Sequence, residues 1–526
     1  GLVPKLNIPN YAEFYEVRHF TTGKNEVTYV NINGEEVPFG ANILFKTDAC
    51  EDFVLAVEIC EDLWTAMPPS VNHALAGATI IANISASNEV IAKDEYREML
   101  VKSQSAKLYC GYIYSDAGYG ESTTDLVFAG DNMIAENGTI LARSKRFNNE
   151  CVYTELDLER LVGERKKSNT YNIVGSEKYV SVKLDMNIGD TKITRYVDKQ
   201  PFVPSDDKKR EKRSEEILSI QSLGLKKRLD HTHAKTAVVG VSGGLDSTLA
   251  LLVTVRAFDS LNIDRKNIIA VTMPCFGTTD RTYNNAVNFA NSLGVTLKEV
   301  NIKAAVNQHF ADIEHDPNVY DVTYENSQAR ERTQILMDVA NKSGGLVIGT
   351  GDMSELALGW ATYNGDHMSM YGVNAGVPKT LIRYLVDYEA KRTNNDILKK
   401  TLQDILDTPV SPELLPPKDG KISQKTEHIV GPYELHDFFL YHLMRFGSKP
   451  SKILRLAEVA FDGIYDREVI LEWLKVFYRR FFAQQFKRSC LPDGPKVGSV
   501  ALSPRGDWRM PSDASYQIWA KELETL

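Results

Sequence analysis

Short apolar runs alternate with polar turns through the first part of the chain. The runs at 53–59, 78–84 and 109–114 predict the buried strands of a β-rich region. Residues 125–144 predict a hairpin that turns at an Asn-Gly pair. We therefore expect residues 1–195 to form a domain of their own.

Strand-like and helix-like runs alternate in the second part, which we assign to residues 236–526. The predicted strands are 236–241, 267–273, 295–302 and 346–350. The predicted helices include 248–258, 281–293 and 325–342, the last two of which end at glycines. This alternation predicts an α/β fold with a doubly wound parallel sheet, whose active site lies at the carboxyl ends of the strands.

Polar segments connect and interrupt these regions. Every residue of 206–213 is charged, which favours a solvated linker or helix face over a binding patch. Three later leucines fall on one helical face: Leu218, Leu225 and Leu229. We assign 196–235 to a linker and connecting helix. The polar residues 393–427 are expected to form either a mobile loop over the site or a plain surface insertion.

Composition narrows the class of protein. A chain of 526 residues predicts two domains or more, and 43% hydrophobic residues can fill sizeable cores. The net charge of −9 argues against a nucleic-acid partner. No apolar run reaches the length of about 18 residues that a membrane span needs. The six cysteines form no Cys-x-x-Cys pair, which suits a reducing cytoplasm better than a disulfide framework.

The sequence Ser-Gly-Gly-Leu-Asp-Ser at 242–247 is the most specific motif. It joins a predicted strand to a predicted helix, and Gly243 and Gly244 let backbone N–H groups close on a phosphate at the helix N-terminus. No Gly-Lys-Ser/Thr follows, so this is not the Walker form. Asp246 lies inside the loop, where a carboxylate beside phosphates predicts a Mg²⁺ between them.

A second strand brings further candidates to the same edge of the sheet. The strand at 346–350 ends in Thr350, and Glu355 follows in a first helical turn. Asp246 and Glu355 can therefore share a Mg²⁺ that neutralises departing pyrophosphate, unless Glu355 only caps its helix. Trp360 and Tyr363 come next and either stack on a flat ring or pack against the core.

These motifs resemble known families. The 242–247 loop is similar to that of the PP-loop ATP pyrophosphatases, which cleave ATP between its α- and β-phosphates to form an adenylated intermediate. Residues 210–526 resemble the synthetase domain of glutamine-dependent NAD synthetases. The similar segments are 242–247, 325–332, 350–366, 485–489 and 491–512. The resemblance implies adenylation of the nicotinate carboxylate of deamido-NAD, then attack by ammonia.

The resemblance also implies residue roles. ATP would be held by Gly240, Val241, Ser242, Gly243, Gly244, Leu245, Asp246, Ser247 and Thr350. Deamido-NAD would be contacted by Asn326, Glu355, Trp360, Ala361, Thr362, Tyr363 and Lys487. Asp246 and Glu355 would bind the Mg²⁺. The family further implies a homo-oligomer and a tunnel for ammonia.

The first region carries a candidate nucleophile. Cys60 lies at the end of the apolar strand 53–59, where a thiol is placed for nucleophilic attack. The alternative is a structural role, because most single cysteines are simply buried in the core. Glu61 and Asp62 follow directly and are expected to raise the pKa of Cys60, so a nearby cation is needed. Lys5 is the candidate cation.

Residues 5–20, with Cys60 in its context, resemble the nitrilase superfamily over residues 1 to about 185. The resemblance implies an αββα sandwich and a Glu-Lys-Cys triad that hydrolyses glutamine through a thioester. Glu16 matches the glutamate that orients the lysine. Glutamine-binding positions are matched by Tyr11, Ser87 and Lys93.

The family's general base lies well before its lysine motif, and only four residues precede Lys5. We therefore expect this chain to be cut from a longer protein and the base to lie outside it. On that expectation the chain makes NAD from deamido-NAD, ATP and ammonia but is nearly inert with glutamine.

The sequence thus favours an ATP-dependent amide ligase of the NAD synthetase type, with an amidohydrolase domain that feeds it ammonia. One alternative is another PP-loop glutamine-dependent amide ligase, of the GMP or asparagine synthetase type. A stand-alone nitrilase-type amidohydrolase is a second alternative, but it leaves residues 242–247 unexplained. A non-catalytic scaffold is the third.

Overall fold

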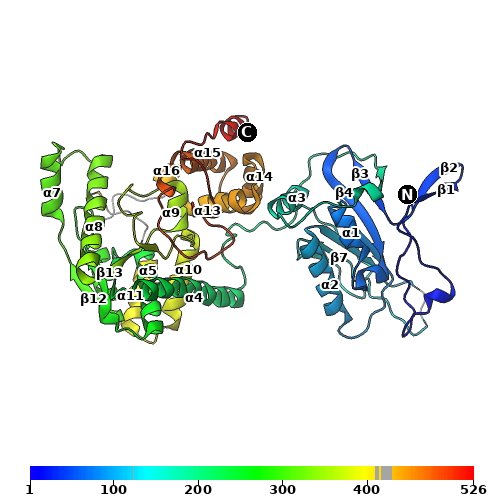
Figure 1. Ribbon diagram of the computed structural model, residues 1–526, viewed down its shortest axis with the longest axis horizontal. Coiled ribbons are helices and arrows are strands. Elements are labelled where there is room, and N and C mark those ends of the chain that lie inside the picture. The colour runs from blue at the N-terminus through cyan, green and yellow to red at the C-terminus, as the bar shows by residue number, and fades with distance from the viewer. Residues whose placement is uncertain (122–123, 409–413, 416–428) are drawn as a thin grey trace. The chain divides into compact units, whose positions relative to one another are not determined.

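The computed structural model describes residues 1–121, 124–408, 414–415 and 429–526. The chain divides into two compact units, Gly1–Tyr196 and Val197–Leu526, drawn from blue to cyan and from green to red in Figure 1. Each unit has its own sheet and its own hydrophobic core. Among the described residues, no helix combines the length and the apolar character that a membrane crossing requires.

The first unit is built on a seven-stranded sheet with the order β8-β7-β6-β5-β4-β3-β9. Its strands are β3 (Ile43–Thr47), β4 (Cys50–Ile59), β5 (Ile80–Ser85), β6 (Gly111–Asp116), β7 (Met133–Glu136), β8 (Thr139–Arg143) and β9 (Val180–Lys183). Strands β4, β5 and β6 are parallel. Their carboxyl ends therefore meet at one edge of the sheet, where Cys60, Ser87 and Asp116 lie.

Helices and a small ribbon complete this unit. The ribbon pairs β1 (Thr28–Ile32) with β2 (Glu35–Phe39). The helices are η1 (Glu16–Arg18), η2 (Cys60–Trp64), α1 (Pro69–Leu75), α2 (Lys93–Leu108), α3 (Leu158–Lys167) and η3 (Ser176–Lys178). Side chains of α1 and α2 pack on the sheet, and the core they share includes Ala56, Ile81, Val101 and Tyr112. The described residues thus hold one mixed sheet covered by helices, in keeping with the predicted α/β class.

The second unit contains a five-stranded, fully parallel sheet with the order β12-β11-β10-β13-β14. Its strands are β10 (Thr236–Gly240), β11 (Ile268–Thr272), β12 (Thr296–Glu299), β13 (Gly345–Gly349) and β14 (Tyr371–Gly372). The chain moves from β10 to β11 and β12, then returns to the other side of β10. The point between β10 and β13 is therefore a topological switch point, where ligands bind in such sheets.

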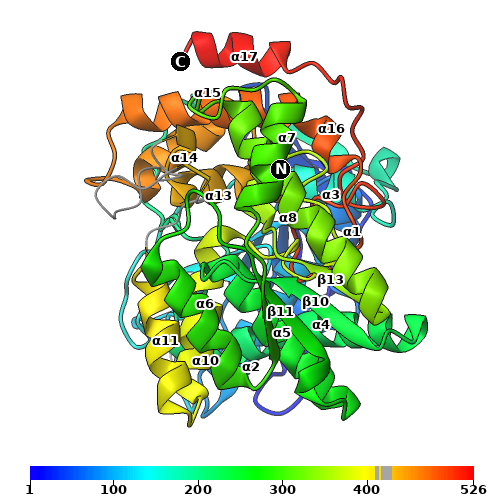
Figure 2. The ribbon, with the colours of Figure 1, turned by 90° about the vertical axis from the view of Figure 1, so that its left-hand side faces the viewer.

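Alternate residues of β10 face different helix layers. Ala237 and Val239 belong to the core formed with α4 (Asp207–Thr232), α5 (Leu245–Leu261) and α6 (Asp280–Leu293). Val238 belongs to the core formed with α7 (Lys303–Asp312) and α8 (Val322–Ser343). Helices on both faces explain why the strands are near-continuous apolar runs. The doubly wound parallel sheet predicted from the sequence is confirmed (Figure 2).

The other regular elements described in the second unit are helices. It contains α9 (Met353–Leu358), α10 (Lys379–Arg392), α11 (Asp396–Leu406), α13 (Tyr433–Tyr441), η5 (His442–Phe446), α14 (Pro450–Ala460), α15 (Arg467–Ala483), α16 (Gln485–Arg488) and α17 (Gln517–Glu524). Aromatic side chains dominate the core between α9, α13 and α15, with Phe438, Phe439, Phe477 and Phe481 fully buried. This helical layer lies next to the switch point because α9 begins just after β13.

Two sequence predictions differ from the structure. Residues 393–427 were expected to form a loop or surface insertion, but Asp396–Leu406 is helix α11, and its Leu398, Leu402 and Ile405 are buried against α6 and α10. Most of the remaining part, 409–413 and 416–427, lies outside the described residues. Strand β12 is also shorter than predicted. Helix α4 packs the three leucines predicted on one helical face into the core of the second unit.

Candidate functional site

The phosphate loop joins β10 to α5. Gly243 has a φ of +84°, and a Cβ added there would lie 2.2 Å from the carbonyl oxygen of Thr282. Only glycine therefore fits at this position. The Gly244 N–H donates to Oγ of Ser242 at 3.2 Å, and Gly244 is the N-cap of α5. The sequence thus forms a tight turn that aims the positive end of a long helix at the carboxyl edge of the sheet.

A cavity of about 250 Å³ opens beside this loop. Its walls come from the ends of β10, β11 and β13 and from the side chains of α8. The lining residues predicted from the sequence are Gly240, Val241, Ser242, Asp246, Ser247, Thr350, Glu355 and Trp360. Arg332 of α8 also lines the cavity. The structure therefore gathers most of the expected ATP-binding residues around one space at the switch point.

Three carboxylates and a lysine form a cluster in this region. Oxygen atoms of Asp246, Asp352 and Glu355 lie within 4.8 Å of one another. Nζ of Lys379 lies 2.6 Å from Asp246, 2.6 Å from Asp352 and 2.9 Å from Glu355. Lys379 is the first residue of α10 and is only 4% exposed. Sequence reasoning missed both Lys379 and Asp352.

Burial and charge determine the protonation of this cluster. Burial raises the pKa of Glu355 to about 7, against the opposing effect of Lys379. Burial also raises the pKa of Asp352 well above its usual value. Burial alone would lower the pKa of Lys379, but the three carboxylates together raise it well above its usual value. The lysine is therefore a cation at neutral pH, in a site that carries an excess of carboxylates.

The cluster suits a divalent cation. Oδ2 of Asp246 accepts a hydrogen bond from Lys379, whereas its Oδ1 is buried and has no hydrogen-bond partner among the described residues. A buried carboxylate oxygen without a partner is costly unless a ligand satisfies it. Oxygen ligands beside phosphates are what Mg²⁺ prefers. The residues present therefore fit the ion predicted from the sequence.

The loop at 359–363 gathers the residues expected to contact the dinucleotide. The Thr362 hydroxyl donates to Oδ1 of Asn326 at 2.7 Å. Nζ of Lys487 donates to the carbonyl oxygens of Gly359 at 2.8 Å and Ala361 at 2.6 Å. Burial lowers the pKa of this lysine. Asn326, Thr362 and Lys487 are far apart in sequence, so the fold brings them to one loop.

The two aromatic side chains of this loop have different surroundings. Trp360 lines the cavity, and the guanidinium of Arg480 lies over its ring at 5.4 Å. Tyr363 stacks on His367 with ring centroids 5.4 Å apart and remains 44% exposed. Nε of Arg330 donates to the carbonyl oxygen of Tyr363 at 3.3 Å. Tyr363 therefore offers an accessible ring, whereas Trp360 forms part of the cavity wall.

In the first unit, Cys60 lies at the turn after β4. Its φ is +51°, a left-handed conformation that is uncommon for a residue other than glycine. Its N–H donates to Oδ1 of the fully buried Asn83 at 3.2 Å. Nζ of Lys5 forms an ion pair with Glu16 at 2.7 Å. The expected nucleophile is thus held in a strained turn, and the expected lysine is oriented by Glu16.

The two acids after Cys60 are engaged by other groups. The Tyr11 hydroxyl donates to both oxygens of Glu61, at 2.9 and 3.0 Å, and burial raises the pKa of Glu61. Both oxygens of Asp62 accept backbone N–H groups. The sequence predicts only an effect of these two acids on the pKa of the thiol. In the structure each of them also has its own hydrogen-bond partners.

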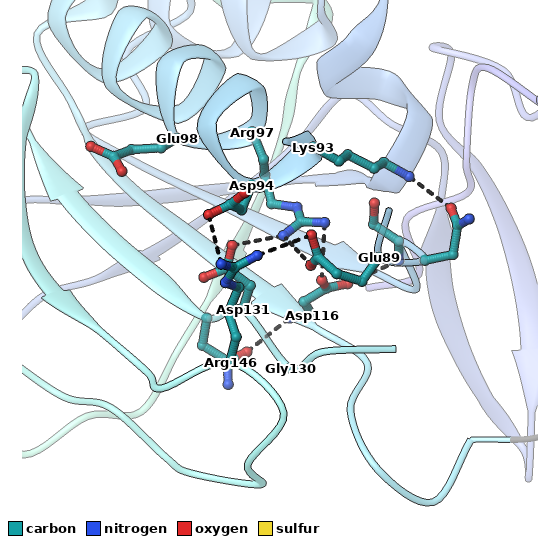
Figure 3. A network of polar contacts seen from close by, with 12 residues as sticks. Glu89, Lys93, Asp94, Arg97, Glu98, Asp116, Gly130, Asp131 and Arg146 are labelled. Atoms are coloured by element: carbon teal, nitrogen blue, oxygen red, sulfur yellow. Dashed lines mark hydrogen bonds and ion pairs between the residues drawn. The ribbon is translucent and has the colours of Figure 1, made fainter. Parts of the chain in front are cut away.

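Ser87 and Lys93, the two remaining candidates for glutamine binding, are held in a polar network. The Ser87 N–H donates to Oδ1 of Asp116 at 2.9 Å, and Lys93 donates to Oδ1 of Asn88 at 2.7 Å. Figure 3 shows Lys93 one turn before Arg97 on α2, with Asp116 close to the Arg97 guanidinium. Arg97 is fully buried and pairs with Asp131 at 2.7 Å. Burial raises the pKa of Asp116 to about 6.

Comparisons with known proteins find similar sequences. A family model described as NAD synthase matches residues 217–464. The glutamine-dependent NAD(+) synthetase of Mycobacterium tuberculosis (strain ATCC 25618 / H37Rv) is 42% identical over 558 residues, covering 100% of this chain and 82% of that protein. The protein of the same name from Aquifex aeolicus (strain VF5) is 28% identical over 520 residues, covering 97% of this chain and 80% of that one.

A solved structure also resembles the chain. The crystal structure of a glutamine-dependent NAD(+) synthetase from Cytophaga hutchinsonii matches with a TM-score of 0.50 and 21% sequence identity. The match covers 99% of this chain and 81% of that chain. At this identity the likeness concerns the fold alone.

Proposed function

The chain belongs to the family of glutamine-dependent NAD(+) synthetases, and from this premise we propose how its residues perform the reaction. It catalyses the ATP-dependent amidation of deamido-NAD to NAD, with glutamine as the source of nitrogen. The observation that carries the proposal is the phosphate loop at the switch point, with Asp246, Glu355 and Lys379 gathered at its mouth.

The second unit activates the carboxylate. A carboxylate is a poor electrophile, so an oxygen of the nicotinate carboxylate attacks the α-phosphorus of ATP, and the bond to the β-phosphate breaks. The loop N–H groups and the α5 N-terminus stabilise the phosphates, and Lys379 offsets the charge of pyrophosphate as it leaves. Mg²⁺, bound by Asp246 and Glu355, would supply further charge neutralisation.

The amide forms in a second step. Ammonia attacks the carbonyl carbon of the adenylate, AMP leaves with the electron pair of its C–O bond, and the nitrogen loses a proton. The loop at 359–363, with Asn326 and Lys487, holds the dinucleotide, and the exposed ring of Tyr363 stacks on a flat group. Water must be kept out at this stage, because it would return the adenylate to the acid.

The first unit supplies the ammonia. The Cys60 thiol attacks the side-chain amide of glutamine and expels ammonia, and water then cleaves the thioester to glutamate. Lys5, oriented by Glu16, lies on the segment that packs against the Cys60 turn. Tyr11, Ser87 and Lys93 position the glutamine. The first unit therefore releases ammonia from glutamine, and the second unit uses it to form NAD.

Two further features complete the proposal. All six cysteines are free, which agrees with a reducing cytoplasm. We also expect a homo-oligomer, as the family resemblance implies, and size measurement in solution tests it.

The test is product formation by the purified full-length protein. With deamido-NAD, ATP, Mg²⁺ and either ammonium or glutamine, we expect NAD, AMP and pyrophosphate in equal amounts. The competing substrates are XMP and aspartate, which a GMP or asparagine synthetase type would amidate. Amidation of either, without NAD from deamido-NAD, would assign the chain to the alternative ligases. Glutamate release without ATP cleavage would favour a stand-alone amidohydrolase.

A further inference from the structure

A single buried carboxylate joins two separate segments of the first unit. Asp62 is 1% exposed. Its Oδ2 accepts the N–H of Ile59 at 2.9 Å and that of Leu6 at 3.5 Å. Its Oδ1 accepts the backbone N–H of Asn7 at 2.9 Å and the Nδ2 group of Asn7 at 2.8 Å. One side chain therefore ties the segment at Leu6 and Asn7 to the end of β4.

These two segments carry the expected catalytic pair. Ile59 directly precedes Cys60, and Leu6 directly follows Lys5. Asp62 thus holds the residue next to the nucleophile and the residue next to the lysine at the same time. The Cys60 N–H is held from another side by Asn83, which is also fully buried. The backbone on both sides of the thiol is fixed by buried acceptors.

Capping of a short helix does not account for this arrangement. Asp62 lies in the first turn of η2, and its bond to the Ile59 N–H satisfies one free donor of that turn. The bonds to Leu6 and Asn7 serve no part of η2, since these residues are 55 and more positions away. Hydrogen bonds to a carboxylate are stronger than those between neutral groups. Asp62 therefore accepts most of its hydrogen bonds from Leu6 and Asn7, in the segment that carries Lys5.

We propose that Asp62 is a positioning residue of glutamine hydrolysis, which sets Lys5 against Cys60 without touching the substrate. The inference rests on the proposed roles of Cys60 and Lys5. Lys5 has a long, flexible side chain, and its Glu16 contact orients only the ammonium. The Asp62 bonds fix the backbone from which that side chain extends. A displacement of about 1 Å in such a group can cost about a hundredfold in rate.

The first test is Asp62→Asn in the full-length protein. Asparagine keeps the volume of the side chain but replaces one acceptor oxygen by an NH₂ group, which faces N–H donors. We expect kcat for glutamine hydrolysis to fall about a hundredfold, with KM for glutamine within about twofold. NAD formation from ammonium should stay within about twofold. Asp48→Asn, an exposed acid of the same unit, is the matched control and should change neither reaction.

A second readout separates positioning from general loss of structure. The rate of Cys60 alkylation by iodoacetamide, measured against pH, reports the reactivity of its thiolate. In Asp62→Asn the profile should change, because the backbone that carries Lys5 is no longer fixed to the Cys60 turn. An unchanged profile with an unchanged kcat overturns the proposal. A raised KM with an unchanged kcat overturns it as well, since Asp62 would then act on glutamine binding.

A milder variant covers the case in which Asp62→Asn folds poorly. Asn7→Ala removes only the Nδ2 bond, so kcat for glutamine should fall by about threefold with KM unchanged. No change in kcat for this variant contradicts the proposal. A further variant, Cys60→Ala, distinguishes a failure of the Asp62 proposal from a failure of the proposed function. If Cys60→Ala hydrolyses glutamine like the unaltered protein, the assignment of the nucleophile is wrong, and Asp62 has no pair to position.

Discussion

Nζ of Lys379 lies 2.6 Å from Oδ2 of Asp246, so the start of α10 is joined directly to the phosphate loop. The Lys379 backbone N–H also donates to Oγ of Ser354 in α9, at 2.8 Å. Asp437 of α13 accepts hydrogen bonds from Ser354 and from Thr380. The ammonium is thus placed by three helices at the mouth of the loop, where a triphosphate would meet three carboxylates.

Lys379→Met should abolish most amide formation with either nitrogen source. Methionine keeps the length of the side chain but removes the only cation in contact with the cluster among the described residues. We expect the rate of pyrophosphate release to fall at least about a hundredfold, corresponding to a loss of about 3 kcal/mol in transition-state stabilisation. Thermal unfolding of the variant checks for the separate cost of leaving Asp352 unpaired. A near-normal rate at saturating ATP would contradict the assigned role.

Asp246→Asn tests the metal site. The change removes a charged oxygen that has no partner among the described residues, so Mg²⁺ should bind more weakly. We expect the Mg²⁺ concentration for half-maximal rate to rise about tenfold or more and the maximal rate to fall. Asp259→Asn, an exposed acid at the other end of α5, is the control and should leave both quantities unchanged. Unaltered pyrophosphate release by Asp246→Asn at every Mg²⁺ concentration rules out this metal site.

Two neighbouring glycines give a graded test of the phosphate loop. Gly243→Ala places a Cβ 2.2 Å from the Thr282 carbonyl oxygen in a left-handed backbone, so the loop must move. In Gly244→Ala the nearest atom is the Ser242 hydroxyl oxygen at 3.3 Å, and the backbone conformation is ordinary. We expect Gly243→Ala to lower kcat/KM for ATP about a hundredfold or more, and Gly244→Ala to lower it far less. Equal effects in steady-state kinetics would contradict the assigned geometry.

The sequence predicted the parts of the fold that have a local pattern. Near-continuous apolar runs marked β4, β5, β10, β11 and β13 because helices cover these strands. The glycine pair at 243–244 marked the phosphate turn, and Gly243 adopts a positive φ that favours a residue without a Cβ. Helix α11 was missed because only a narrow stripe of leucine and isoleucine interrupts its polar sequence. Its burial depends on α6 and α10, which the sequence of α11 does not reveal.

The missed site residues depend on long-range contacts. Lys379 belongs to no motif, and it meets Asp246 across 133 positions of sequence. The sequence around Lys379 nonetheless indicates a buried cation. Lys379 is a lysine between the buried Val377 and the buried Leu381, and a cation in an apolar stretch must find carboxylates in the fold. Asp62 was taken only as a charge beside Cys60, because its partners at Leu6 and Asn7 are distant in the chain.

The buried His436 predicts acid sensitivity of the second unit. Burial lowers its pKa from 6.5 to about 4, with a further contribution from Arg480, and its Nε2 lies in hydrogen-bond contact with the Val430 carbonyl oxygen. Below pH 6.5 this histidine is protonated in the unfolded chain, whereas in the folded unit it stays neutral until about pH 4. The free energy of unfolding should therefore fall as pH drops through this range, by up to about 3 kcal/mol from this group.

Denaturant unfolding between pH 7 and 4 measures this effect. His436→Gln keeps a donor for Val430 and does not titrate, so its stability should depend less steeply on pH. His73 of the first unit has a pKa lowered to about 4 by burial and provides a second source of acid sensitivity in the protein. An identical pH dependence in His436→Gln would show that this histidine is accessible to protons in the folded state.

Cys60→Ala separates the two chemistries of the full-length protein. Cys60 lies in the first unit, whereas the phosphate loop, the acidic cluster and Lys379 lie in the second. The variant should lose glutamine-driven NAD formation, by about a thousandfold or more, because no thioester can form. NAD formation from ammonium salts should persist, since no residue of the activation site is altered. Parallel assays with the two nitrogen sources measure this, and loss of both would place Cys60 in the ligase reaction or in folding.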